Sequence, residues 1–197
     1  MNDLILPFLQ SFTTLFLVVD PPGIIPLFVS MTYNMDKETA GKLLIKSMII
    51  AFLLLFTFTL FGRSILYLFS IDLYDFRVAG GLLLFIISLQ MIFGLDTQGY
   101  TSRPLGIVPL ATPLLAGPGA VTAAIVMSGT TGIITTALAC AAVFIISYYL
   151  LKLSKYLLAF TGKEFMDVLA KVIGLILAAI SIHYIREGII GIYIMLR

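Results

Sequence analysis

Charged residues are scarce in this chain of 197 residues. Only 11% of the residues are Asp, Glu, Lys or Arg, whereas 60% are hydrophobic. Soluble domains carry about 25% charged residues, so the composition excludes an ordinary water-soluble domain. The net charge of +2 is small and the basic residues are dispersed, which excludes a nucleic-acid partner. The lipid bilayer is therefore the first partner that the sequence predicts.

Cysteine and histidine occur once each. Cys140 is alone within "LACAAVF", which excludes a disulfide and a paired thiol site, and we interpret it as a packing residue. The chain contains neither an HExxH nor a GxSxG motif, so no pair of nucleophile and base can be named. We expect no catalytic residues, no metal and no cofactor, and a membrane enzyme is the least favoured alternative.

Long apolar runs fill most of the chain. A helix needs about 20 residues to cross about 30 Å of hydrocarbon, and no barrel-like alternation is visible, so we expect an all-α fold in a single transmembrane domain, residues 1–197. Asp72 and Asp75 are interpreted as solvated turn residues between spans. The six predicted spans lie near residues 4–32 (interrupted), 43–61, 78–95, 104–128 (interrupted), 133–151 and 168–187. Beyond the last span, the tail either extends that helix or lies along the membrane surface.

The distribution of Lys and Arg predicts the orientation. With the N-terminus outside, eight basic residues of the connecting segments, Lys37 and Lys155 among them, fall on the cytoplasmic side. Three others, Arg63, Arg77 and Arg197, fall on the outer side. The excess favours a multi-pass protein with both termini outside.

An internal repeat relates the two halves of the chain. Placing Pro22 and Gly23 over Pro118 and Gly119 aligns "DPPGIIPLFVSMT" with "AGPGAVTAAIVMS" at an offset of 96 residues. A second alignment, of "GLLLFIISLQM" with "GLILAAISIHY", has an offset of 93. It pairs Gly81 with Gly174, Ser88 with Ser181 and Gln90 with His183. Residues 1–100 and 101–197 are thus predicted to be two copies of a three-span unit. Because three spans leave the chain on the opposite face, the copies are expected to be inverted, as in many secondary transporters.

Both copies carry helix breakers inside a predicted span. The stretch "VVDPPGIIPLF" contains three prolines, a glycine and Asp20, although proline costs a helix interior about 3 kcal/mol or more. A break frees backbone carbonyls before it and N–H groups after it, so the half-helix ends offer opposite partial charges. A zwitterion fits such a site, with its carboxylate on the N–H end. Gly23 and Gly119 would let a ligand approach the backbone.

Two motifs, "DPPGIIPLF" and "PLATPLLAGPGAVT", resemble the paired signature of the MarC family of six-span membrane proteins over essentially the whole chain. The motif positions are Asp20, Pro22, Gly23, Pro26, Pro113, Gly117, Pro118 and Gly119. The family is similar to a wider LysE-type group of amino-acid exporters. The resemblance implies a carrier in the prokaryotic plasma membrane that moves small neutral amino acids such as glycine or alanine.

The predicted site lies near the membrane midplane between the two interrupted helices. Its substrate-binding residues are Asp20, Pro21, Pro22, Gly23, Pro26, Thr112, Pro113, Gly117, Pro118, Gly119 and Thr122. Candidates for the lining of the path are Ser88, Gln90, Ser181 and His183. Simpler roles are also open: Asp20 as a helix N-cap, and Gln90 and His183 as interhelical hydrogen-bond partners. A channel is the alternative to a carrier, and a coupling Na⁺ or H⁺, the direction of transport and the oligomeric state are left open.

Overall fold

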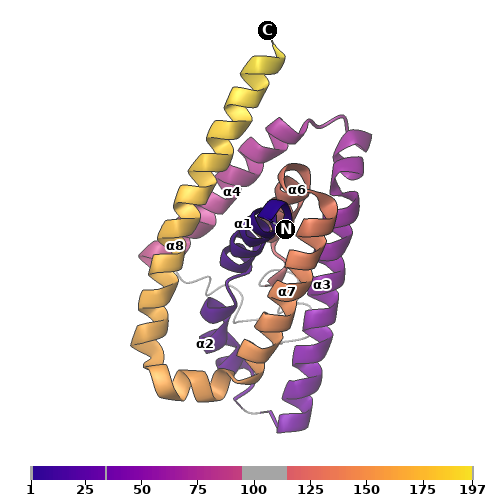
Figure 1. The fold of residues 1–197 in the computed structure, drawn as a ribbon. Coiled ribbons are helices and arrows are strands. Elements are labelled where there is room, and N and C mark those ends of the chain that lie inside the picture. Colours follow the sequence, from indigo (N-terminus) through magenta and orange to yellow (C-terminus); the bar gives the residue numbers. More distant parts are fainter. Residues whose placement is uncertain (1, 34, 95–114, 197) are drawn as a thin grey trace.

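Every regular element in the described part of the chain is an α-helix (Figure 1). The computed structural model describes residues 2–33, 35–94 and 115–196. The helices are α1 (Asn2–Val19), α2 (Pro21–Met31), α3 (Lys37–Leu68), α4 (Leu73–Phe93), α6 (Pro118–Thr130), α7 (Ile133–Lys152) and α8 (Ser154–Met195). The predicted all-α class is confirmed.

Five helical stretches among the described residues are long and apolar enough to cross a membrane. They are Leu4–Pro26, Lys37–Leu68, Leu73–Phe93, Ile133–Lys152 and Glu164–Met195. Helix α6 is apolar but has 13 residues, and such a helix is only about 20 Å long. The other part of the predicted fourth span, 104–114, lies outside the described residues. The count of six spans therefore stays a prediction.

Two aspartates set where helices begin. The Asp36 carboxylate accepts hydrogen bonds from the backbone N–H groups of Glu38 and Thr39, at 3.1 and 3.0 Å, and caps α3. Asp72 caps α4 in the same way through Tyr74 N–H at 2.9 Å. Asp72 lies in the connection between α3 and α4, as predicted, whereas Asp75 is exposed but lies within the first turn of α4 and not in the turn before it. A carboxylate stabilises that end of a helix through the exposed amides and the helix dipole.

Helix α8 is longer than the span predicted from the sequence. It includes a change of direction at Gly162, whose φ of 78° lies in the left-handed region that glycine adopts without strain. Beyond Gly162 the helix runs without interruption to Met195, so the C-terminal tail extends the last span and does not lie apart from it. Figure 1 shows this end of α8 projecting past the other helices.

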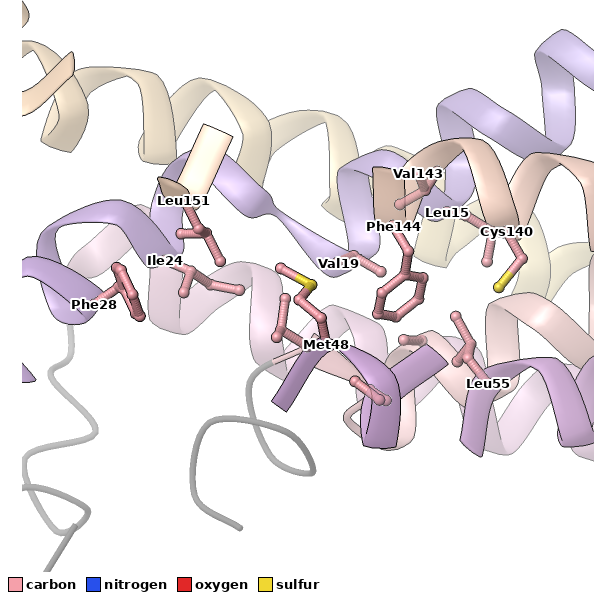
Figure 2. Close-up of a cluster of buried hydrophobic side chains, with 14 of the residues drawn as sticks. Leu15, Val19, Ile24, Phe28, Met48, Leu55, Cys140, Val143, Phe144 and Leu151 are labelled. Carbon is pink, nitrogen blue, oxygen red and sulfur yellow. The ribbon is translucent and has the colours of Figure 1, made fainter. Parts of the chain in front are cut away.

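The helices of the two halves pack across one another. Helix α2 packs against α7 and α8, whereas α6 packs against α3 and α4. Further contacts join α3 to α7 and α4 to α8, and α1 lies against α6 and α7. Buried side chains of α1, α2, α3 and α7 meet in the main apolar cluster (Figure 2). Cys140 belongs to this cluster and is fully buried, which confirms its role in packing.

Candidate functional site

Asp20 separates α1 from α2. Its φ of 47° is left-handed, a conformation that Asp adopts more readily than most residues. The Asp20 N–H donates to the carbonyl of Phe16 at 2.9 Å and closes α1. The Asp20 side chain accepts from Gly23 N–H at 3.2 Å, and its carbonyl accepts from Ile24 N–H at 3.3 Å. One residue thus ends α1 and caps α2.

The first turn of α2 has no amide left for a ligand. Pro21 and Pro22 have no N–H, Gly23 N–H donates to the Asp20 carboxylate, and Ile24 N–H donates to the Asp20 carbonyl. The sequence predicts free N–H groups after this break, and the structure shows that this prediction is wrong for α2. Pro26 lies inside α2 and removes the donor that would otherwise reach the Pro22 carbonyl.

The start of α6 is capped less completely. Gly117 is its N-cap and supplies no side-chain hydrogen bond, although its carbonyl accepts from Val121 N–H at 3.1 Å. Pro118 has no N–H. Among the described residues, no group accepts a hydrogen bond from the N–H of Gly119 or Ala120. The two equivalent helix starts therefore differ in their free donors. Thr112 and Pro113 lie outside the described residues.

Neither motif glycine faces open space. A Cβ added to Gly23 would collide with the Asp20 carboxylate. A Cβ added to Gly119 would lie 2.7 Å from Leu84 Cδ2 and 3.6 Å from Val18 Cγ1. Close packing, and not ligand access, explains both glycines in this structure. The contact with Val18 nevertheless brings the start of α6 beside the end of α1.

The predicted polar residues of the path divide into two groups. The hydroxyls of Ser88 and Ser181 are buried and donate to carbonyls of their own helices, at 2.6 and 2.7 Å. The hydroxyl of Thr122, a predicted substrate-binding residue, likewise donates to a carbonyl of its own helix, that of Pro118, at 3.0 Å. Gln90 is half-buried near the end of α4. Of the four path candidates, His183 lines the cavity between α1, α4, α6 and α8, and the other three do not line it.

That cavity has a volume of about 500 Å³ and lies between α1, α4, α6 and α8. Such a volume is typical of small-molecule sites, which span about 300–1,000 Å³. Its polar lining includes Gln10, Thr14, Arg77, His183, Tyr184 and Glu187. The residues of the α1–α2 break are absent from the lining: Thr14 precedes Asp20 by about 9 Å along α1.

Two buried side-chain atoms of the described residues lack a hydrogen-bond partner, Arg77 Nε and the Tyr184 hydroxyl. Both residues line the cavity, with only 9% and 4% of their surface exposed. The Thr14 side chain lies close to the Tyr184 hydroxyl and lines the same cavity. An Arg at the centre of a membrane-spanning helix costs about 2.5–3.5 kcal/mol on insertion scales, and the cost is lower near a helix end, where Arg77 lies. Buried polar atoms left unpaired at this cost commonly mark functional sites.

Sequence reasoning missed Arg77. We had assigned it to an outer loop, and this was wrong: Arg77 lies within α4 and is buried. The Asp72 cap was the available signal, because a helix that begins at Leu73 carries Arg77 into its second turn. Glu187, which the sequence analysis did not single out, lines the same cavity as His183.

A chain of hydroxyl groups lies beside the cavity. The Ser11 hydroxyl of α1 hydrogen bonds to the Thr131 hydroxyl at 2.6 Å. Thr131 is also joined to the Thr136 hydroxyl at 3.1 Å and donates to the Met127 carbonyl at 2.8 Å. These bonds tie α1 to the turn between α6 and α7.

The long apolar helices define a polytopic integral membrane protein. The family model described as MarC family integral membrane protein matches residues 6–193, and the chain belongs to this family. The chain is 33% identical over 195 residues to a UPF0056 membrane protein of Archaeoglobus fulgidus, covering 92% of each protein. It is 32% identical over 200 residues to the UPF0056 membrane protein YhcE of Escherichia coli, covering 94% of this chain and 93% of YhcE. These names specify no substrate. None of the solved structures matches the chain.

Proposed function

We propose that this MarC-family protein is a secondary transporter of small neutral amino acids, such as glycine or alanine, in the plasma membrane of a prokaryote. Alternating access requires two halves that can rock against each other around one site, and inverted repeats provide such halves. The observation that carries the proposal is the exchange of packing partners between the two halves of the chain. Substrate and membrane are its two partners.

The exchange follows the repeat. Helices α2 and α6 hold equivalent positions, as do α3 and α7, and α4 and the part of α8 beyond Gly162. Helix α2 packs on α7 and α8, and its equivalent α6 packs on α3 and α4. A two-fold relation between the copies produces this pattern. Such a relation exchanges α3 with α7 and α4 with α8, so the α3–α7 contact and the α4–α8 contact are each converted into themselves. The pattern supports inverted repeats.

The crossing of α4 and α8 adds atomic detail to this argument. A Cβ on Gly81 would lie 2.9 Å from the Ser181 carbonyl oxygen, and a Cβ on Gly174 would lie 3.2 Å from that of Ser88. An offset of 93 residues converts the first contact into the second. Small residues allow helices this close approach. Each copy therefore places its glycine, Gly81 or Gly174, against the backbone of the equivalent serine in the other copy. An isologous interface requires this reciprocity.

The path of the substrate follows the junction between the copies. We propose that six spans exist and that α6 is the second half of an interrupted fourth span, as α2 is of the first. The proximity of Val18 and Gly119 supports convergence of the two interruptions. Figure 1 shows the α2–α3 connection and the α7–α8 turn at the same end of the molecule. Lys37 and Lys152 lie there, which supports a cytoplasmic assignment of this end and outside termini.

Transport by purified protein in proteoliposomes tests the function. We expect saturable uptake of labelled alanine that is accelerated by unlabelled alanine inside the vesicles, since a carrier exchanges solute across one site. Flux that does not saturate and shows no counterflow would identify a channel. Imposed Na⁺ or proton gradients, applied one at a time, determine the coupling ion. Absence of flux for glycine, alanine and serine would reject the proposed substrates.

A further inference from the structure

We propose that the cavity between α1, α4, α6 and α8 is the solute's binding site on this path, with Arg77 as the ligand of its carboxylate and Glu187 as the partner of its ammonium group. That the solute is an amino acid rests on the proposed function. The carboxylate site itself rests on the residues that line the cavity.

Arg77 is built into the cavity wall and is not free to extend into water. Only 9% of its surface is exposed, and its Nε has no hydrogen-bond partner although it is buried. Its guanidinium carbon lies 5.7 Å from the centre of the Tyr74 ring, which occupies one face of the group. A planar guanidinium whose Nε has no partner matches a carboxylate, because a carboxylate accepts two parallel N–H bonds from such a group.

Helix packing fixes this arrangement. Tyr74 lies against Gly191 of α8, where an added Cβ would collide with the Tyr74 ring. A Cβ on Gly188 would lie 2.8 Å from the Tyr74 carbonyl oxygen. The two glycines let α8 approach α4 closely enough to hold Tyr74 beside Arg77. The guanidinium is therefore preorganised before any ligand binds.

Opposite charges line the same cavity without neutralising each other. Glu187 is half-buried and shares the lining with Arg77. Among the described residues, one ion pair has its atoms within 4 Å of each other, and it joins Lys42 to Glu38. Arg77 and Glu187 therefore do not form an ion pair. Separated charges of both signs in one small cavity match the two ends of an amino acid.

The rest of the wall favours an uncharged side chain. Val126, Met127, Ile176 and Ile180 line the cavity together with Ala179. A charged substrate side chain would lie against these apolar groups without a partner, which disfavours its binding. The geometry thus points to small neutral amino acids. A solute that lacks the carboxylate should bind more weakly than one that has it.

Binding of three related probes to the full-length protein in nanodiscs tests the assignment. The probes are alanine, propionate, which lacks the amine, and alaninamide, which lacks the carboxylate. We expect Arg77→Gln to weaken alanine and propionate binding by about 10- to 100-fold, the range for a charge-assisted hydrogen bond. The same change should leave alaninamide binding unaltered. Glu187→Gln should weaken alanine and alaninamide and spare propionate.

Matched controls separate the site from general charge effects. Arg63→Gln removes an exposed Arg that lies close to Gly129, near the C-terminal end of α6. Glu164→Gln removes an exposed acid of α8. Neither should change binding of any probe. Should Arg77→Gln fail to fold, Arg77→Lys keeps the charge but loses the planar fork, and we expect it to weaken propionate binding at least tenfold.

Chemical protection gives a second readout that needs no substitution at Arg77. In a Cys140→Ala background, Ala179→Cys places a thiol in the cavity lining. Alanine and propionate should slow its reaction with a maleimide by at least threefold, and alaninamide at the same concentration, which lacks the contact with Arg77, should slow it less. Unchanged labelling with all three probes would overturn the site.

The outcomes distinguish the two proposals. Binding of propionate but not alanine, abolished by Arg77→Gln, keeps the carboxylate site and rejects the amino-acid substrate. Transport of alanine that is unaffected by Arg77→Gln keeps the transporter and overturns the site. If none of the probes binds the wild-type protein, the site is overturned and the proteoliposome assay decides the function separately.

Discussion

The start of α2 and the start of α6 are paired by the alignment of the two halves of the sequence, yet they are stabilised differently. Asp20 supplies both a carboxylate and a carbonyl to the first amides of α2. Gly117 supplies only a carbonyl to those of α6. The amides of Gly23 and Ile24 at the start of α2 thus have acceptors on Asp20. The amides of Gly119 and Ala120 at the start of α6 have no acceptor among the described residues. The two helix starts therefore differ in the hydrogen bonds that their first amides form.

The largest expected effect comes from filling the close contact at the start of α6. Gly119→Leu cannot fit between Leu84, Ile87 and Val18, whose nearest atoms are 2.7 to 3.6 Å from the added Cβ. We expect alanine counterflow to be lost and the protein to be destabilised by about 1–3 kcal/mol, as for other overpacked sites.

The matched control is Gly41→Leu, because no atom lies within 4 Å of a Cβ at Gly41. This variant should transport at the wild-type rate. Wild-type counterflow by Gly119→Leu would show that the contact between α1, α4 and α6 is not needed for transport.

Removing the carboxylate at the start of α2 should have the next largest effect. Asp20→Ala loses the hydrogen bond to Gly23 and puts a residue that disfavours left-handed backbone at a φ of 47°. We expect a loss of about 1–2 kcal/mol in stability, measured by denaturation in nanodiscs. Asp20→Asn keeps a cap and tolerates this backbone, so it should lose less than about 0.5 kcal/mol.

The comparison of Asp20→Asn with the wild-type protein also tests coupling. Equal transport would assign Asp20 to capping alone. Loss of transport at unchanged stability would give the carboxylate a further part in ion or substrate binding.

Making the second helix start resemble the first should have a small effect. Gly117→Asp introduces a side-chain acceptor at an N-cap whose φ of −65° suits Asp. Asp exceeds Gly at an N-cap by only a few tenths of a kcal/mol, so a slight rise in thermal stability is expected. A large loss of transport at normal stability would show that the amides of α6 contact the substrate.

The smallest effect is expected at Asp36, which forms the same kind of cap outside the membrane-spanning segments. The Thr39 side chain and amide lower the pKa of Asp36 below its usual value of 3.8. Because the folded pKa is the lower one, this stabilisation is complete above pH 3.8 and is lost as the pH falls through the folded value. Denaturation of Asp36→Ala and wild type should therefore differ slightly at neutral pH and converge in acid. A difference that persists in acid would contradict this origin.

Much of the fold followed from local rules. The prolines after Val19 predicted an interruption, and α1 ends at Val19. The alignment of Gly81 with Gly174 identified residues that lie at the crossing of α4 and α8. Such features could be predicted because a missing N–H or a missing Cβ acts on its immediate surroundings wherever the chain goes.

The candidate site could not be predicted in the same way. Sequence shows that Asp20 carries a carboxylate but not that the side chain turns back onto Gly23. Arg77 follows a turn-rich stretch, and its burial depends on Tyr74, on α8 and on α6, which are brought together only by the fold. A charge is read as functional or as a loop residue according to its neighbours in space, and these are not its neighbours in sequence.

The hydroxyls of Ser11, Thr131 and Thr136 join α1, α6 and α7 on one side of the cavity. Hydrogen bonds between membrane helices are each worth about 0.6 kcal/mol and up to about 1.7, so two in series resist separation of these three helices. The two bonds therefore hold the turn between α6 and α7 against α1 and restrain the wall of the cavity to which Thr131 belongs.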